Sequence, residues 1–398
     1  MSVDLHYGAS HSLTIDCTTE QVLTSASLNV EPIIGTLKDA VYSSLEQSIH
    51  FPAFREIVFP EDTLAIAVGE SIPRTAEILA TIIEYIQTYT EVALEDITIV
   101  FANESTASVE AQLKHLLDEF VYSTLTFEVH NPDIPEELAY LTATEEGEPI
   151  RLNKTLVDSD VVFPICSNLP DSIFGYAGFF HDLFPLYTET ETILRFRSYQ
   201  NAASLKRDSM EAANMLGVQY VMKVTPANGD EIHNITAGDI FTLQNSVPAI
   251  ADAIWGHSLS ESDLSIGTLS GPYQHQTWDN LARALNTLAK STASTGAIVI
   301  CSELSGPLPA PLRLLASNDA HQKLSEQLKQ QPDIDIQAAQ EILRLRDEYH
   351  IYLLSNLSGD DVESIGLANI ESPSQINNLV TAAKKVNCLL DAHRIAIK

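Results

Sequence analysis

The sequence predicts an α/β protein of two domains, each built on a parallel sheet covered by helices. Short apolar runs alternate with amphipathic helical segments along the whole chain, which is typical of this fold class. The 398 residues are long enough to form two domains. A fresh alternation of strand and helix starts after residue 257, which divides the chain into domains 1–257 and 258–398.

The first domain is expected to open with a hairpin and then to repeat a strand and helix unit. Residues 5–16 alternate around Tyr7-Gly8, which predicts two short antiparallel strands. Residues 63–68 and 97–102 are almost continuously apolar, as strands buried on both faces are. The other expected elements are helices 33–49, 75–89, 109–120, 204–216 and 248–255 and strands 126–130, 157–166, 219–224 and 231–237.

The second domain repeats the pattern in a smaller form. Its expected strands are 263–268, 296–301 and 349–354, and its expected helices are 277–290 and 374–386. The loop 269–276 joins the first strand to the first helix. We expect this smaller domain to face the first.

The charge balance is strongly acidic. The chain has 22 Lys and Arg against 54 Asp and Glu, a formal net charge of −32, which repels phosphate backbones and anionic membrane surfaces. We therefore expect no nucleic acid and no membrane partner. Four scattered cysteines without a Cys-x-x-Cys pair, and no basic segment leading into an apolar run, fit a cytoplasmic protein with reduced thiols.

Three polar loops follow predicted parallel strands, at 69–74, 103–107 and 167–181. Because the carboxyl ends of parallel strands share one edge of the sheet, these loops form the first candidate site. The third loop contains two glycines together with Asp171 and His181. The same stretch would also suit a tight, aromatic-rich core loop, and the sequence leaves both interpretations open.

Several common site motifs are missing from the sequence. It contains no Gly-x-Gly-x-x-Gly and no Gly-Lys-Ser or Gly-Lys-Thr phosphate loop. It also lacks Gly-x-Ser-x-Gly and His-Glu-x-x-His, which lowers the odds of a serine hydrolase or a zinc protease.

The order of the segments resembles the nickel-pincer-nucleotide lactate racemases and their relatives, from about Tyr7 to the C-terminus. The resemblance implies a two-domain α/β fold with the active-site cleft between the domains, a covalently tethered nickel pincer cofactor in that cleft, and hydride transfer at the carbon of a 2-hydroxy acid. The matching stretches are Leu5-His6-Tyr7-Gly8, 96–102, 147–153, Gly175-Tyr176-Ala177-Gly178 with Pro185, 211–218, and Gly271-Pro272-Tyr273 with 281–285.

The residues that carry the family's chemistry differ in this chain. Thr106 and Asp171 stand where the family has its two catalytic histidines. His181 replaces the lysine that anchors the cofactor, and Arg197 falls near the histidine that ligates the metal. A hydroxyl is no general base near neutral pH without help, and imidazole cannot make the same tether. The cofactor and any metal are therefore unknown.

Other family positions keep their charge. The family's phosphate-binding loop aligns with Glu70-Ser71-Ile72-Pro73-Arg74, so the resemblance gives Glu70 and Arg74 a cofactor-binding role. A family lysine near the substrate becomes Arg283, which could clamp a carboxylate, and Tyr273 lies in the matching substrate loop. Arg283 could equally be a solvated charge on a helix.

Two functional hypotheses follow. The first is a racemase or epimerase of a 2-hydroxy acid or sugar acid with altered or lost nickel-pincer chemistry. In it, His181 and Asp171 act as acid and base and Arg283 binds the carboxylate. The alternative is a catalytically inactive binding protein that keeps the interdomain cleft for a carboxylate or a nucleotide. Both make a small molecule the expected partner.

Overall fold

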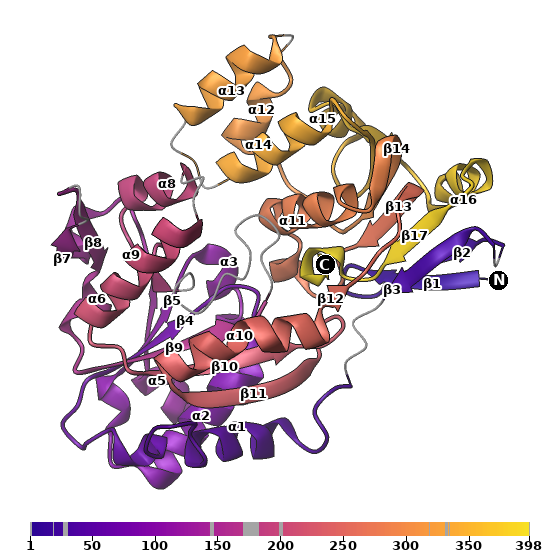
Figure 1. The fold of residues 1–398 in the computed structure, drawn as a ribbon. Helices are drawn as coiled ribbons and strands as arrows, with labels where there is room; N and C mark the ends of the chain where they lie inside the picture. The colour runs from indigo at the N-terminus through magenta and orange to yellow at the C-terminus, as the bar shows by residue number, and fades with distance from the viewer. Residues whose placement is uncertain are drawn as a thin grey trace.

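The computed structural model describes residues 2–18, 20–26, 31–143, 147–169, 183–198, 202–317, 319–330, 333 and 335–397. The chain forms two lobes, each around a six-stranded sheet (Figure 1). This confirms the predicted α/β class with two parallel-rich sheets covered by helices.

The first sheet is parallel except for one edge strand. Its strand order is β11-β10-β9-β4-β5-β6, and only the hairpin between β10 and β11 is antiparallel. The strands are β4 (Leu64–Val68), β5 (Ile97–Phe101), β6 (Thr126–Val129), β9 (Val161–Ser167), β10 (Tyr220–Pro226) and β11 (Ile232–Asp239).

Helices cover both faces of the first sheet. One apolar core joins it to α1 (Leu37–Glu46), α2 (Thr75–Tyr89), α4 (Glu110–Leu116) and α5 (Glu119–Thr124). The core on the other face includes α6 (Lys154–Asp158), α8 (Thr190–Ser198), α9 (Ala202–Met215) and α10 (Ile240–Ile254). A hairpin of β7 (Leu138–Ala143) and β8 (Pro149–Asn153) and the short helix α3 (Glu104–Ala107) complete the lobe.

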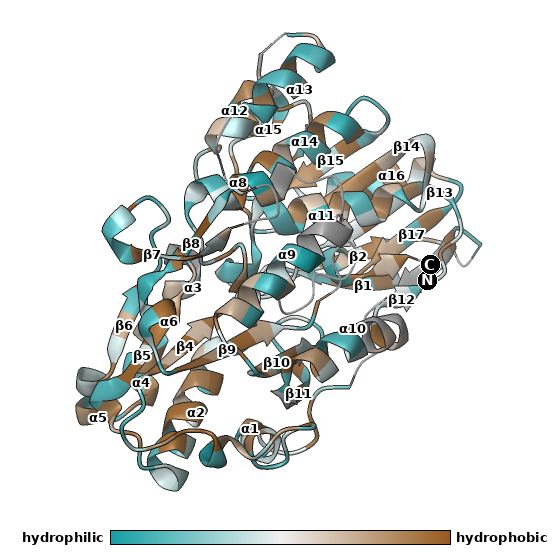
Figure 2. Ribbon diagram, turned by 60° about the vertical axis from the view of Figure 1, so that its left-hand side comes forward, coloured by the Kyte–Doolittle hydropathy of each residue, from teal (hydrophilic) through white to brown (hydrophobic). Residues whose placement is uncertain are grey.

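The second sheet is parallel throughout, in the order β16-β15-β14-β13-β17-β3. Its strands are β3 (Val22–Ala26), β13 (Ser262–Thr268), β14 (Thr292–Cys301), β15 (His350–Leu354), β16 (Ala368–Ile370) and β17 (Val386–Leu389). Its helices are α11 (Trp278–Ala289), α12 (Ala310–Leu314), α13 (His321–Lys329), α14 (Ile336–Leu345), α15 (Gly359–Ser364) and α16 (Pro373–Ala382). Figure 2 shows hydrophobic residues along the strands and many hydrophilic residues on outer helices such as α13.

The N-terminal residues lie with the second sheet, whereas the predicted division placed them in the first domain. Strand β3 pairs with β17, and the hairpin of β1 (Ser2–Tyr7) and β2 (His11–Asp16) packs into a core shared with α16. The hairpin has one apolar face, because buried and exposed residues alternate along β1. That face packs against the second sheet. The hairpin therefore lies in the second lobe, whereas α1, which follows it in the sequence, lies in the first.

Most predicted elements are present, with differences at their ends. Helix α2 has the predicted bounds. The predicted helix 109–120 is broken into α4 and α5, because the Asp118 side chain accepts a hydrogen bond from the Phe120 N–H and starts a new helix. The β7–β8 hairpin and helices α13 and α14 were not predicted. No helix in the described ranges has the length and apolar character of a bilayer span.

Candidate ligand site at the seam between the lobes

Each sheet has one point where the chain changes direction across the strands. From β4 the chain moves outward through β5 and β6 and then returns to β9 on the other side of β4. In the second sheet it moves from β13 to β16 and returns to β17 on the other side of β13. We call this point the switch point of the sheet. Ligands of open parallel sheets bind there, outside the carboxyl ends of the strands.

A buried polar network joins the carboxyl ends of the two sheets. Asp391, after β17, accepts hydrogen bonds from the N–H of Ser270 (2.8 Å) and its hydroxyl (2.5 Å), and from the Gly229 N–H (3.1 Å). Arg394 donates to the carbonyls of Ala227 and Gly229, both at 2.9 Å. Asp391 and Arg394 are fully buried. The turn after β10 is therefore held against the switch point of the second sheet.

A second contact lies between other parts of the same two edges. The Gln274 side-chain N–H donates to the Ser108 hydroxyl at 2.8 Å. Ser108 follows α3 after β5, and Gln274 lies in the loop after β13. We call the line between these two contacts the interlobe seam, formed by loops 69–74, 103–108 and 227–230 of one lobe and 269–276 and 390–395 of the other.

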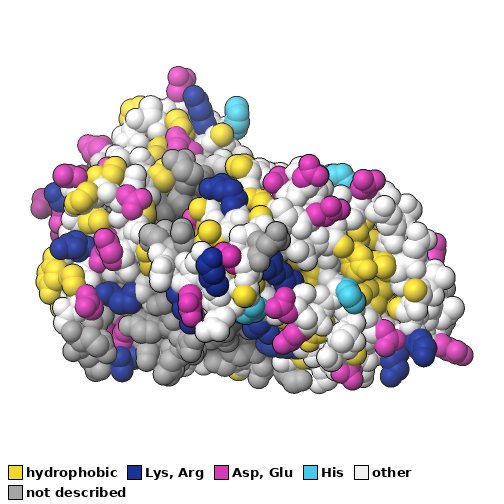
Figure 3. All heavy atoms as spheres, turned by 90° about the horizontal axis from the view of Figure 1, so that it is seen from above, with side chains coloured by type: hydrophobic (Ala, Val, Ile, Leu, Met, Phe, Trp, Pro, Cys, Tyr) yellow, Lys and Arg dark blue, Asp and Glu magenta, His cyan; other side chains and the backbone are white. Residues whose placement is uncertain are grey.

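The charge on one face of the molecule is uneven. Figure 3 shows Lys and Arg side chains gathered toward the middle of this face, beside atoms that are not described, although the whole chain carries a formal charge of −32. Positive charge concentrated in one place attracts anionic ligands locally.

Thr106 forms a reciprocal cap with Asn103 at the start of α3. Its N–H donates to Asn103 Oδ1 (3.0 Å), and its hydroxyl accepts from the Asn103 N–H (3.0 Å) and donates to the Asn103 carbonyl (2.8 Å). Asn103 Nδ2 in turn donates to Glu70 Oε1 at 2.7 Å. The structure thus brings Thr106 and Glu70 together through Asn103, and the Thr106 hydroxyl is occupied by the cap.

Arg74 is held by its own helix. Its side chain forms a bidentate pair with Glu77, in the first turn of α2, and this hydrogen bond raises the pKa of Arg74. The Arg74 N–H also donates to Asp230 Oδ1 at 3.1 Å, which joins the loop after β4 to the turn between β10 and β11. The fork that would hold a phosphate is therefore already used by a carboxylate.

Arg283 is connected to the loop after β13. Its Nη1 donates to Asn280 Oδ1 (3.1 Å), and Asn280 Nδ2 donates to the His275 carbonyl (2.9 Å). Arg283 is partly buried on α11, while Tyr273 in the same loop is 63% exposed. These two predicted substrate residues thus lie on the second lobe's side of the seam.

The predicted residues Asp171 and His181 lie outside the described residues, and so does the side chain of Arg197, whose backbone belongs to α8. The sequence analysis also missed four buried residues at the seam: His275, Asp391, His393 and Arg394. The available signal was the run Asp391-Ala392-His393-Arg394 directly after an apolar strand, which places charge where a parallel sheet ends.

The two buried histidines are held neutral. Burial, followed by the positive charge of Arg394, keeps the pKa of His275 and that of His393 well below the ordinary value of 6.5. Arg394 Nη2 lies 3.2 Å from His275 Nδ1, so the imidazole must accept this hydrogen bond. Neither imidazole carries charge near neutral pH.

The described residues offer no metal centre. Within the described ranges, no three His, Cys, Asp or Glu side chains converge on a point that could hold an ion. Burial also raises the pKa of Cys301 and of Cys388 to about 12, so neither thiol is a ready ligand.

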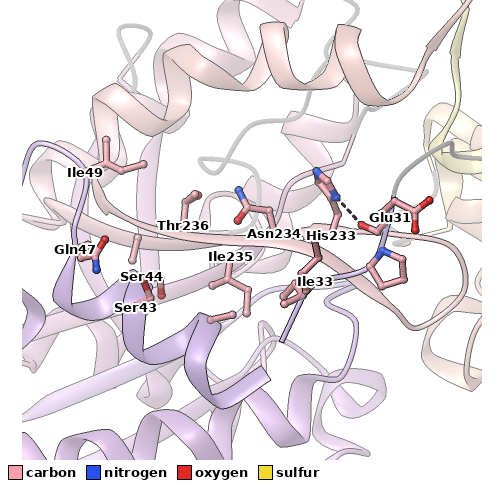
Figure 4. A pocket seen from close by; sticks show the side chains of 14 residues that line it. Glu31, Ile33, Ser43, Ser44, Gln47, Ile49, His233, Asn234, Ile235 and Thr236 are labelled. Atoms are coloured by element: carbon pink, nitrogen blue, oxygen red, sulfur yellow. Dashed lines mark hydrogen bonds between the residues drawn. The ribbon is translucent and has the colours of Figure 1, made fainter. Parts of the chain in front are cut away.

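One pocket lies at the seam and another lies away from it. A pocket of about 370 Å³ is lined by the β1–β2 turn, residues 228–230 and 270–272, and Leu390. A larger one, about 510 Å³, lies between α1 and β11, where His233 Nδ1 is 2.8 Å from the Glu31 carbonyl (Figure 4). The second pocket flanks the antiparallel edge of the first sheet, so it does not share the ends of the parallel strands.

Together these features define a class: a two-lobed α/β protein whose two sheets meet at their carboxyl ends. Residues 7–198 match the model of the lactate racemase N-terminal domain. These residues therefore form a domain of the lactate racemase N-terminal family.

Solved structures agree on the fold. The lactate racemase apoprotein from Thermoanaerobacterium thermosaccharolyticum superposes with a TM-score of 0.82 at 16% identity, over 100% of both chains. A protein from Thermotoga maritima superposes with a TM-score of 0.69 at 12% identity, over 92% of this chain and 99% of its own. Among curated proteins, none matches this sequence.

The residues present do not fit the nickel pincer that the family implies. At the described positions, the Thr106 hydroxyl is committed to the α3 cap and the Arg74 fork to Glu77. The described part of the chain also offers no cluster of metal ligands. We therefore derive no reaction step through that cofactor.

Proposed function

We propose that this protein binds a small carboxylate, such as a 2-hydroxy acid or a sugar acid, at the interlobe seam. The observation that carries the proposal is the position of Arg283, which is tied through Asn280 to the loop at the second switch point. A guanidinium matches a carboxylate with two parallel N–H groups. The concentration of basic side chains in Figure 3 supports an anionic ligand.

We further propose that the protein binds this ligand without pincer-dependent hydride transfer. Support comes from Thr106 and Arg74, since each replaces or displaces a residue of the family's chemistry and each is engaged in local hydrogen bonds. Their side chains would have to leave these partners before acting on a ligand or a phosphate.

A second candidate is a racemase or epimerase that uses His181 and Asp171 as acid and base. It is favoured by the family match over residues 7–198 and by two titratable groups in one loop of the sequence. In this case Arg283 would bind the same carboxylate, so the two candidates share a ligand class and differ in turnover.

Calorimetric titration with lactate, glycerate, gluconate and AMP tests the binding proposal. We expect a carboxylate to bind and Arg283→Met to weaken it roughly 10- to 100-fold, the usual effect of losing a charge-assisted pair. Arg344→Met, on the exposed side of α14, is the matched control and should leave the Kd unchanged. If none of the three carboxylates binds, the proposal is wrong, whether or not AMP binds.

Turnover separates the two candidates. Protein purified from its native host should contain no near-stoichiometric nickel and show no added nucleotide by intact mass. Racemisation of a bound 2-hydroxy acid that is lost in His181→Ala would instead establish the isomerase.

A further inference from the structure

We infer that the first lobe binds an extended peptide segment, which adds as a short strand to the outer edge of β11. The segment occupies the pocket of about 510 Å³ between α1 and β11 (Figure 4). This pocket shares no lining residue with the interlobe seam, so the inference goes beyond the proposed carboxylate binding and does not depend on it.

Strand β11 is an edge strand of the first sheet, and other parts of the chain close its outer edge at both ends. At one end the Ile33 N–H donates to the Ile232 carbonyl at 2.8 Å. At the other end the Ile49 N–H donates to the Ala237 carbonyl, also at 2.8 Å. Residues 233–236 lie between these two contacts and line the pocket, and we call them the open stretch of β11.

Ile235, in the open stretch, turns its main-chain donor and acceptor away from the sheet. It lies opposite Val224 in the β10–β11 hairpin. The Val224 carbonyl accepts from the Asn168 N–H at 2.8 Å, so Val224 faces β9. Opposite residues of an antiparallel pair either bond to each other or both face away, so the N–H and C=O of Ile235 point to the outer edge. Within the described part of the chain, neither group has a hydrogen-bond partner.

This donor and acceptor match one kind of ligand best. A residue in an extended conformation also turns its N–H and its C=O to one side, so it can form two hydrogen bonds with Ile235. Exposed sheet edges bind extended peptides in this way. A carboxylate or a phosphate could satisfy the N–H but has no proton for the carbonyl.

The closed ends limit the length of the ligand. The open stretch is about 13 Å long at a rise of about 3.3 Å per residue. Pairing with β11 of a second copy needs a longer free edge, and the chain at Ile33 and Ile49 already occupies both ends of it. A segment of three or four extended residues therefore fits better than a second copy of the protein.

The lining of the pocket indicates which side chains the segment carries. Ile235 packs in the apolar core that includes α1, and a peptide residue opposite it turns its side chain to the same face. Ala40, Ser43 and Gln47 of α1 line the pocket there, which suits a small apolar side chain. Glu31 lies at one end of the pocket, and the whole chain has a formal charge of −32. Basic flanking residues are therefore attracted and acidic ones repelled.

Fluorescence polarisation with short labelled peptides tests the inference. The probes are Lys-Thr-X-Thr-Lys with both ends capped, where X is Ala, Val or Leu. We expect at least one of them to bind, and an N-methyl group on the nitrogen of X should weaken that binding at least roughly 10-fold, because it removes the N–H that pairs with the Ile235 carbonyl. Replacing both lysines by glutamates should also weaken binding.

A protein variant tests the position of the peptide. Ser43 is exposed on α1 and lines the pocket, so Ser43→Phe should fill the space and weaken binding at least roughly 10-fold. Ser123→Phe, exposed on α5, is the matched control and should leave the Kd unchanged. The melting temperature shows whether each variant is folded. Hydrogen exchange of the Ile235 amide should slow when the peptide binds.

Four results would overturn the inference. One is that none of the three peptides binds at about 1 mM. Another is that the N-methyl peptide binds as tightly as its parent. A third is unchanged exchange at Ile235, which places the peptide elsewhere. The last is association of two copies of the protein that Ser43→Phe abolishes, which assigns this edge to a second copy.

Discussion

Acid should weaken the second lobe through its buried histidines. His275 and His393 are almost fully buried, and burial keeps the pKa of each imidazole well below 6.5 in the folded protein. In the unfolded chain each returns to about 6.5. The unfolded state therefore binds more protons below that value, so stability is present above pH 6.5 and is lost as the pH falls.

The size of the effect follows from these pKa shifts. Between about pH 7.5 and about pH 5.5, each histidine that stays neutral in the fold lowers the free energy of unfolding by about 1.4 kcal/mol. The two together lower it by about 2.7 kcal/mol. That is a substantial part of the 5–15 kcal/mol that stabilises a typical domain.

Tryptophan fluorescence can follow the unfolding of the second lobe. The chain has two tryptophans, Trp255 and Trp278, and both lie in the core of the second lobe, where the histidines are. Urea unfolding at several pH values gives the free energy at each pH. His393→Asn should remove about 1.4 kcal/mol of the pH-dependent change, and His115→Asn, exposed on α4, should remove none. The reasoning would be refuted if the free energy of unfolding fell equally with decreasing pH in His393→Asn and in the unaltered protein.

Further predictions concern the polar network of Asp391 and Arg394 and the carboxyl ends of the strands of the first sheet. Asp391→Ala leaves the Arg394 charge buried without its carboxylate, so urea unfolding should show a loss of roughly 3–5 kcal/mol; a loss below about 1 kcal/mol would mean that the network does not hold the lobes. The Tyr187 hydroxyl lies 2.8 Å from the carbonyl oxygens of both Val68 and Val100 and shares its single proton between them, so Tyr187→Phe should cost about 1–3 kcal/mol in thermal or urea unfolding. An unchanged Tyr187→Phe protein would show that these strand ends are satisfied without the hydroxyl.

Local features of the structure were open to prediction from the sequence. The bounds of α2 follow from the spacing of its apolar residues, which depends only on the helical repeat. The cap between Asn103 and Thr106 is also local, since it joins residues three apart, and could have been predicted from the pair. The position of Glu70 after a buried strand was visible too, although its partner was not.

The sequence by itself determined the class of fold and the strand ends where polar residues gather, because both depend on periodicity within short segments. Only the tertiary structure decided that β3 joins the second sheet, that the β1–β2 hairpin packs against it, and that Asp391 and Arg394 contact the turn after β10. These arrangements join residues more than 150 positions apart. Which apolar face covers which sheet, and which buried charge meets which partner, depends on the packing of the whole chain, so no local pattern records it.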